Sequence, residues 1–184
     1  MKRIETPFAR KLESHGPVIM VTAYDEENHR TTGMTNQWNM VIDDCHNVIK
    51  MGPRSHTLQC ILKTRKYVIN IPSRRMLDAV NFFGRNCGKD INKFEKTGLH
   101  LQKCESEGFG ELIIEECLAA FEMSVEKLIP FEDGGYMIVG KVEVCHAREE
   151  FFKDGKFLYN EKTDINDLPL HHLGGDKYGV ICLN

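Results

Sequence analysis

The chain has 184 residues, 41% of them hydrophobic, which is enough to fill one core, so we expect a single domain over residues 1–184. Its net charge is -3 and its lysines and arginines are dispersed, a pattern that argues against nucleic acid as a partner. No apolar run approaches the ~20 residues that cross a bilayer, and the start MKRIETPFARK lacks the apolar stretch of a signal peptide. We therefore expect no membrane association and a cytoplasmic location.

An early β-hairpin is predicted from residues 17–41. The apolar, β-branched segment PVIMVTAY (17–24) and the extended segment TTGMTNQWNMV (31–41) are separated by DEENHR, which is polar and turn-prone. The two segments are therefore expected to pair as antiparallel strands.

A short strand that leads directly into a helix is predicted next. The segment NVIKMG (47–52) has the composition of a strand and runs into a proline, after which apolar residues recur at helical spacing over residues 58–62. Ser55 and Thr57 precede that spacing and are expected to cap the helix. The strand end thus leads to the N-terminus of a helix.

A second strand and a second helix follow. The segment YVINIP (67–72) is β-rich, and residues 73–83 form an amphipathic helix that we expect to end at Gly84. The apolar face of this predicted helix consists of Met76, Leu77, Val80 and Phe83.

The C-terminal half is predicted to be mainly β. Residues 121–126 alternate between apolar and polar, and after the turn FEDGG the segment 136–147 is again extended, so the two form a long antiparallel pair. The segment FFKDGKFLY (151–159) adds a shorter hairpin. Strands outnumber helices and do not alternate with them strictly, which favours a barrel with packed helices over a doubly wound sheet.

Cysteine and histidine usage gives little support for a metal site. The seven cysteines are widely dispersed without a CxxC pair, so we read them as reduced thiols, most of them small buried hydrophobes. His171 and His172 are adjacent, and adjacent strand residues point to opposite faces, so we read them as surface or pocket residues. Metal binding is the weaker alternative, and we expect no metal.

The common catalytic and nucleotide-binding motifs are absent from the sequence. It has no G-x-G-x-x-G run, no P-loop, no G-x-S-x-G elbow and no HExxH. What remains are three polar segments at the predicted strand ends, namely residues 35–39, 52–57 and 84–94, each suited to a phosphate or a planar polar ring.

The segment GPRSHT (52–57) combines the Arg54 guanidinium, the hydroxyls of Ser55 and Thr57 and a helix N-terminus, which together suit a phosphate dianion. The alternative is that the hydroxyls only cap the helix and the arginine is solvated. In residues 84–94 glycines would let the backbone approach a ligand, or the segment is only a helix end and a loop. Trp38, the sole tryptophan, either covers a flat ring or anchors the core.

Four ordered segments of the chain resemble the flavin reductase-like FMN-binding split-barrel family, and more closely its flavoredoxin branch. The segment 17–40 is similar to the family's first hairpin, with its Pro-Val strand and Met-Thr-x-x-Trp run. The segment 52–73 is similar to the next block, with a Thr before a helix and an Asn-x-Pro strand end. GRNCGKDINKFEKTGL (84–99) resembles a Gly-rich stretch of the family, and LPLHHLGGDKYGV (168–180) continues the match.

The resemblance implies a mainly β (α+β) fold, a six-stranded antiparallel Greek-key split β-barrel with additional helices. It further implies a homodimer with one FMN per subunit near the subunit interface. The sequence departs from the family pattern at Gln37 and Cys87, where serine is common, and at DDCH (43–46), which replaces an Asp-Pro-Pro turn. By position, the implied ring contacts are Thr35, Asn36 and Trp38, the phosphate contacts are Arg54, Ser55 and Thr57 with Lys93 nearby, and the pocket border is Gly88 and Tyr178.

With FMN bound, the redox chemistry belongs to the cofactor, so no catalytic side chain is assigned. Two enzyme-like functions follow: a flavin reductase that uses NADH or NADPH as a transient electron donor, and a flavoredoxin that passes electrons between redox protein partners. A third, from another class, is a flavin- or haem-binding module without turnover, because one fold can host unrelated functions.

Overall fold

A computed structural model describes residues 16–182 of the chain. The polar segment 1–11, which bears on the signal-peptide prediction, lies outside the described residues. No helix among the described residues is long and apolar enough to cross a membrane. The strands are β1 (Gly16–Pro17), β2 (Ile19–Asp25), β3 (Arg30–Asn36), β4 (Asn39–Val41), β5 (His46–Met51), β6 (Lys66–Ile71), β7 (Leu101–Lys103), β8 (Glu111–Ile114), β9 (Ala119–Pro130), β10 (Tyr136–Ala147), β11 (Phe152–Lys153), β12 (Lys156–Phe157), β13 (His171–His172) and β14 (Tyr178–Gly179). The helices are α2 (His56–Thr64), α3 (Leu77–Arg85) and α4 (Lys93–Thr97), with 3₁₀ turns at Arg74–Met76 and Ile165–Asp167.

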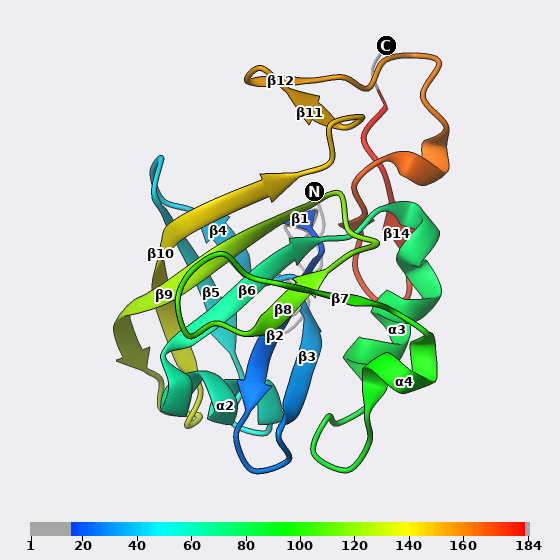
Figure 1. Ribbon diagram of the computed structural model, residues 1–184. Helices are drawn as coiled ribbons and strands as arrows, with labels where there is room; N and C mark the ends of the chain where they lie inside the picture. Colours follow the sequence, from blue (N-terminus) through cyan, green and yellow to red (C-terminus); the bar gives the residue numbers. More distant parts are fainter. Residues whose placement is uncertain (1–15, 183–184) are drawn as a thin grey trace, which may run out of the picture.

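The main sheet has the order β3-β2-β6-β9-β10-β5-β4, and every pairing in it is antiparallel. It contains six long strands together with the three-residue β4 (Figure 1). β3 and β4 occupy opposite edges of this sheet, yet only residues 37–38 connect them, so the sheet must curl until its edges meet. The predicted mainly β, antiparallel split barrel is confirmed.

The predicted first hairpin is confirmed as β2 and β3. Ile19 lies opposite Asn36 at its open end, and Asp25 lies opposite Arg30 at the turn. Both faces of β2 are buried because one packs inside the barrel and the other against the helices. Asp25 also holds the turn, since one carboxylate oxygen accepts hydrogen bonds from the backbone N–H groups of Glu27 and Asn28.

Helix α2 closes one end of the barrel, at the bottom of Figure 1. Leu58 and Ile61 are fully buried and contact interior side chains of the barrel, among them Tyr67 and Met123. The helix ends at Arg65, which has a left-handed conformation with φ 60 and donates its N–H to the carbonyl of Ile61. The apolar spacing predicted for residues 58–62 is therefore the face that fills the barrel.

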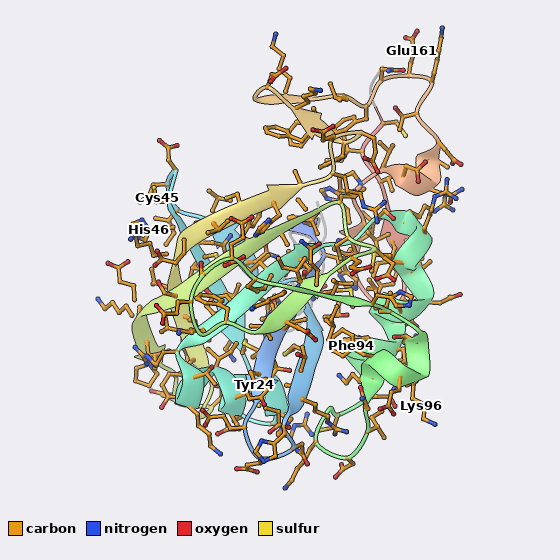
Figure 2. All side chains as sticks on the ribbon, in the orientation of Figure 1. Tyr24, Cys45, His46, Phe94, Lys96 and Glu161 are labelled. Atoms are coloured by element: carbon orange, nitrogen blue, oxygen red, sulfur yellow. The ribbon has the colours of Figure 1, made fainter. Side chains whose placement is uncertain are left out.

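Helices α3 and α4 pack against the outside of the barrel. Val80 and Phe83 of α3 and Phe94 of α4 join one apolar cluster, and the Phe83 and Phe94 rings meet edge to face at 5.1 Å. Figure 2 shows Phe94 pointing from α4 toward the sheet while Lys96 points away. The predicted helix end at Gly84 is wrong by one residue, since α3 continues to Arg85; a Cβ at Gly84 would meet the Thr35 side chain at 3.6 Å, so the glycine faces β3 within the helix.

The predicted C-terminal hairpins are also confirmed. β9 and β10 pair along their length, with irregularities beside Gly140 and Val142, and β11 pairs with β12. A side chain at position 140 would collide with the Tyr67 hydroxyl, 2.0 Å from the added Cβ, so only glycine fits there. The buried Tyr67 side chain thus lies directly against the β10 backbone.

The prediction that most cysteines are small buried hydrophobes is wrong. Only Cys60, Cys104 and Cys117 are buried, whereas the other four are exposed. Cys45 lies in the β4–β5 loop, and Cys145 occupies an outward position near the end of β10. Sequence composition alone does not reveal these positions, because exposure depends on which face of a strand meets another element. The exposed set is Cys45, Cys87, Cys145 and Cys182.

Candidate functional site

A groove runs along the barrel surface where the ends of β3 and β5 meet α3 and the start of α2. It consists of two adjoining cavities of about 230 Å³ and about 660 Å³. Because the cavities share five lining residues, they form one continuous depression, which we call the groove. The shared residues are Met34, Trp38, Lys50, Gly52 and Gly84.

All nine residues predicted for the site line this groove, although they come from four separate segments of the chain. The smaller cavity holds the residues predicted near a ring, and the larger holds those predicted near a phosphate. The smaller cavity is lined by Thr35, Asn36, Trp38 and Tyr178, and the larger by Trp38, Arg54, Ser55, Thr57, Gly88 and Lys93.

The larger cavity contains the N-terminus of α2. Ser55 has the extended conformation of an N-cap, and its Oγ accepts a hydrogen bond from the Leu58 N–H at 3.1 Å, as predicted. Thr57 is buried inside the first turn and is not the cap. This turn contains no acidic residue, so its partial positive charge is available to an anion.

Arg54 lies directly before this cap and is exposed in the groove wall. Within residues 16–182, no carboxylate lies at ion-pair distance from its guanidinium, unlike Lys50 and Arg85, which are paired with Asp133 and Asp176. A free guanidinium beside free helix amides is the donor arrangement that replaces the hydration of a phosphate.

Lys93 is 4% exposed and contributes to the groove wall from the first turn of α4. Its Nζ donates to the Gly33 carbonyl at 2.9 Å and to the Phe83 carbonyl at 2.8 Å. Burial lowers the pKa of Lys93 to about 8. The ammonium has three donors and these carbonyls use two, so the residue both ties α4 to the barrel and retains one donor.

Gly88 lies in the groove wall, but its lack of a side chain serves the fold. A Cβ at this position would lie 2.2 Å from Oγ1 of Thr32, which is a buried side chain. The Gly88 carbonyl accepts a hydrogen bond from the Arg30 guanidinium at 3.1 Å. We expected the glycine to admit a ligand, whereas the closest approach here is to strand β3.

At the smaller cavity Asn36 is buried, and both polar atoms of its side-chain amide are hydrogen-bonded to the protein. Its Nδ2 donates to the Lys50 carbonyl at 2.9 Å, and its Oδ1 accepts the Trp38 N–H at 2.6 Å. The amide therefore links the end of β3 to Trp38, two residues later, and to β5. This fixes the turn that presents Trp38, which is 44% exposed and so is not a core anchor.

Thr35 and Tyr178 attach this end of the groove to α3. The Thr35 hydroxyl donates to the Val80 carbonyl at 2.6 Å, and the Tyr178 hydroxyl donates to Oδ1 of Asn81 at 3.1 Å. The Tyr178 ring meets the His172 ring edge to face at 5.2 Å. His172 also lines the smaller cavity, which agrees with its reading as a surface or pocket residue.

Lys50 and Asp133 also line the groove, although neither was predicted from the sequence. The Lys50 ammonium lies 5.3 Å from the Trp38 ring centroid and 5.6 Å from that of Phe131, and it pairs with Oδ2 of Asp133 at 2.6 Å. This hydrogen bond holds the pKa of Asp133 below its usual value. A lysine inside the apolar strand segment NVIKMG was the available signal, but its carboxylate partner is 83 residues away.

The groove is more basic than the chain as a whole. Lys50, Arg54, Arg85 and Lys93 line its larger cavity, with Asp133 as the acidic counterpart. The arrangement can bind an anion at one end and a planar group beside Trp38 at the other. It can position and tune such a ligand, while a redox step requires a cofactor.

The comparisons with known proteins agree with this architecture. Residues 12–168 match the flavin reductase like domain family. The chain is 25% identical over 177 residues to the uncharacterised protein YddH of Escherichia coli (strain K12), a match that covers 95% of this chain and 92% of YddH.

Solved structures with the same fold include two redox proteins. Nitrilotriacetate monooxygenase component B from Bacillus cereus superposes with a TM-score of 0.84 at 18% identity, covering 100% of this chain and 97% of that one. The flavoredoxin of Desulfovibrio vulgaris (Miyazaki F) superposes with a TM-score of 0.82 at 21% identity, covering 100% and 95%. Together with the family match over most of its length, the fold shows that the chain belongs to the flavin reductase-like FMN-binding split-barrel family.

Proposed function

We propose that this protein is an FMN-dependent oxidoreductase that receives electrons from NADH, NADPH or a protein donor and passes them to an acceptor through flavin bound in the groove. The single observation that carries the proposal is that one groove combines an exposed tryptophan with an arginine at a helix N-terminus that has no carboxylate partner among residues 16–182. FMN has a phosphate at one end and a planar ring at the other, so its two ends match the two ends of the groove.

The residues present fit this cofactor. Arg54, the Ser55–Thr57 segment and Lys93 would hold the phosphate, because they supply charged donors and helix amides on one wall. An added Cβ at Gly52 would meet nothing within 4 Å, so the backbone between the two cavities borders open space that a ligand can occupy. Trp38 would lie beside the ring, while Asn36 holds the turn that carries it.

Bound FMN supplies the capacity to accept a hydride and to release electrons singly or as a pair. The chain itself binds, orients and tunes. No dinucleotide-binding motif occurs in the sequence, so we propose that a nicotinamide donor binds transiently beside the flavin. Because such a donor is a cytoplasmic metabolite, we also propose a cytoplasmic location. A redox protein could take the place of either donor or acceptor.

We also propose that the active form is a homodimer. Apolar side chains are exposed on and beside β4, next to the groove, with Met40 at 61%, Val41 at 72% and Ile42 at 49% exposure. Trp38 and Phe131, which flank Lys50, are exposed as well. A second copy would cover this surface and complete the ring end of the groove. Light scattering is expected to give twice the 21.1 kDa chain mass, and a monomer that still binds FMN tightly would rule the dimer out.

The test of the proposed function is a visible spectrum of the purified full chain, followed by addition of NADH or NADPH without oxygen. We expect a flavin spectrum that bleaches with at least one donor. A chain that stays colourless and takes up no added FMN contradicts the proposal. Binding of FMN or haem without reduction by either nicotinamide or a reduced redox protein favours the alternative, a binding module without turnover.

A further inference from the structure

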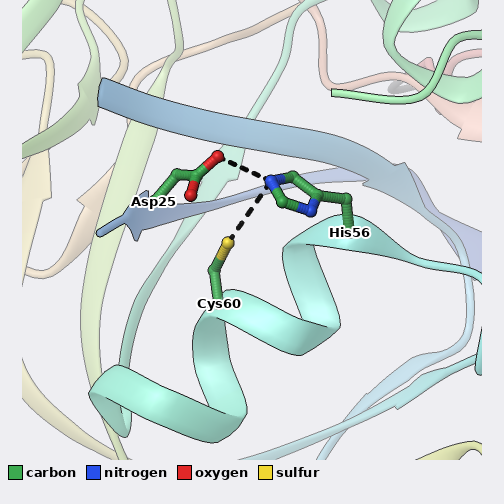
Figure 3. A group of neighbouring side chains, drawn as sticks. All are labelled: Asp25, His56 and Cys60. Atoms are coloured by element: carbon green, nitrogen blue, oxygen red, sulfur yellow. Dashed lines mark hydrogen bonds and ion pairs between the residues drawn. The ribbon is translucent and has the colours of Figure 1, made fainter. Parts of the chain in front are cut away.

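Beside the groove, three potential metal ligands converge at the closed end of the barrel: Asp25, His56 and Cys60 (Figure 3). Of the three, only His56 also lines the larger groove cavity. Their ligand atoms all lie within 4.8 Å of one another. Oδ2 of Asp25 is 2.6 Å from Nε2 of His56, and Sγ of Cys60 is 3.7 Å from the same nitrogen. Among the described residues, this is the one group of at least three such side chains that converges in this way.

The convergence follows from the fold. His56 and Cys60 are four residues apart on α2, so they occupy the same helix face. Asp25 ends β2, the strand that packs against that helix inside the barrel. The ligands therefore come from two rigid elements, and Asp25 is 1% exposed while Cys60 is 4% exposed.

We propose that Asp25, His56 and Cys60 bind a Zn²⁺ ion. A thiolate, an imidazole and a carboxylate form a mixed ligand set that zinc accepts, and three protein ligands leave a fourth position for water. Ligand atoms around tetrahedral zinc lie about 3.3–3.5 Å apart, so the three side chains need to move by only about 1 Å to enclose the ion. A contact between Asp25 and His56 alone would explain two of the three side chains. It would not explain why the Cys60 thiol also lies 3.7 Å from Nε2 of His56.

Neighbouring groups support this assignment. The other oxygen of Asp25 accepts the Glu27 and Asn28 backbone N–H groups, and Nδ2 of Asn28 donates to Oδ2 at 2.7 Å, so the carboxylate is held in place by surrounding donors. A cavity of about 310 Å³ adjoins all three residues and opens a route for the ion and for the fourth ligand.

Binding exchanges protons for the metal. The Cys60 thiol loses its proton to solvent as the zinc–sulfur bond forms. Nε2 of His56 faces the Asp25 carboxylate and so carries a hydrogen in the metal-free protein; that hydrogen leaves Nε2, and the neutral ring keeps its hydrogen on Nδ1, which frees the Nε2 lone pair for the ion. In the absence of metal, burial raises the pKa of Cys60 to about 12. No electron transfer is involved, because zinc has a single stable oxidation state in proteins.

The test uses the full chain, loaded with ZnCl₂, freed of excess metal and analysed by mass spectrometry for zinc. Wild type is expected to retain about one zinc per chain, and Cys60→Ala and Asp25→Asn are expected to weaken zinc binding about a hundredfold or more. Cys104→Ala is the matched control, since it removes another buried thiol. His46→Ala is a second control, since it removes a histidine that contacts the carboxylates of Asp43 and Glu126 away from the proposed site. Figure 2 shows His46 beside Cys45 at the edge of the sheet, in the region of β4 and β5.

Retention of zinc in Cys60→Ala and Asp25→Asn, or equal loss in the two controls, would overturn the proposal. If the variants fail to fold, Co²⁺ added to the wild type decides, because a thiolate ligand produces a charge-transfer absorption that oxygen and nitrogen ligands do not. Absence of that absorption also overturns it. Cys60 does not line the groove, so flavin content measured on Cys60→Ala separates this site from the proposed function.

Discussion

The two ends of the groove differ in what their polar groups are already doing. At the ring end the polar groups of Thr35, Asn36 and Tyr178 hydrogen-bond to the protein itself. At the end proposed to bind the phosphate, Arg54 has no carboxylate partner within residues 16–182, and the first turn of α2 has no acidic residue. The first end therefore holds its backbone and side chains in place, whereas the second has hydrogen-bond donors that the protein does not use. Residues predicted together as ligand contacts can thus serve two purposes, some positioning the groove and others being available to bind.

The largest effect is expected from Asn36→Ala. Its buried amide makes two hydrogen bonds, and their loss leaves the Trp38 N–H and the Lys50 carbonyl without this partner, so the free energy of unfolding should fall by about 2–3 kcal/mol. Chemical denaturation measures it. Asn39→Ala, which removes one exposed hydrogen bond to Pro17, is the matched control and should cost less. Unchanged stability with lost FMN would show that Asn36 contacts the ligand directly.

The second effect tests the binding end. Charge-assisted hydrogen bonds contribute roughly 1.5–3 kcal/mol each, so Arg54→Ala should weaken FMN binding by about tenfold to a hundredfold. Titration of flavin-free protein with FMN and riboflavin gives the two affinities, and riboflavin, which lacks the phosphate, should be nearly unaffected. Arg85→Ala removes a cation from the same wall that is already paired with Asp176 and should have the smaller effect. Equal losses for both flavins would place Arg54 at the ring or in the fold.

Lys93 both ties α4 to the barrel and lines the groove, and measurements across pH distinguish its effect on stability from its proposed effect on phosphate binding. Burial lowers the pKa of Lys93 to about 8 in the folded protein, below the ordinary lysine value of the unfolded chain. Between these two pH values the unfolded chain holds the proton and the folded chain does not, so the free energy of unfolding without ligand should rise as the pH increases from 8. A bound phosphate favours the charged amine, so FMN affinity should fall about tenfold between pH 7 and pH 9. Titrations across this range measure it, and Lys93→Met should remove the dependence. An identical pH profile in this variant would exclude Lys93 as a phosphate contact.

The smallest effect is expected from Cys87→Ser. Cys87 is exposed in the groove wall, and serine is common at this place in the family that the sequence resembles. The rate of anaerobic flavin reduction should stay within about tenfold, equivalent to about 1.4 kcal/mol in the barrier. Stopped-flow absorbance with either nicotinamide provides the rate. Complete loss would point to thiol chemistry at the groove.

The sequence by itself determined the features that depend on neighbouring residues. β-Branched composition on either side of a polar turn located the β2–β3 hairpin, period-2 alternation located β9 of the β9–β10 hairpin, and a serine before a helical apolar pattern located the α2 cap. The ordered family segments also located nine residues that line the groove, because each segment lies at a strand or helix end that the fold brings to one place.

Tertiary structure alone decided the contacts between residues far apart in the sequence. The Lys50–Asp133 pair, the glycine at position 88 against Thr32, and the approach of Asp25 to α2 each join separate segments, so no local pattern encodes them. The same holds for the division of the groove into positioning and binding ends. Whether a polar side chain is free for a ligand depends on its partners across the fold, and those exist only once the barrel has closed.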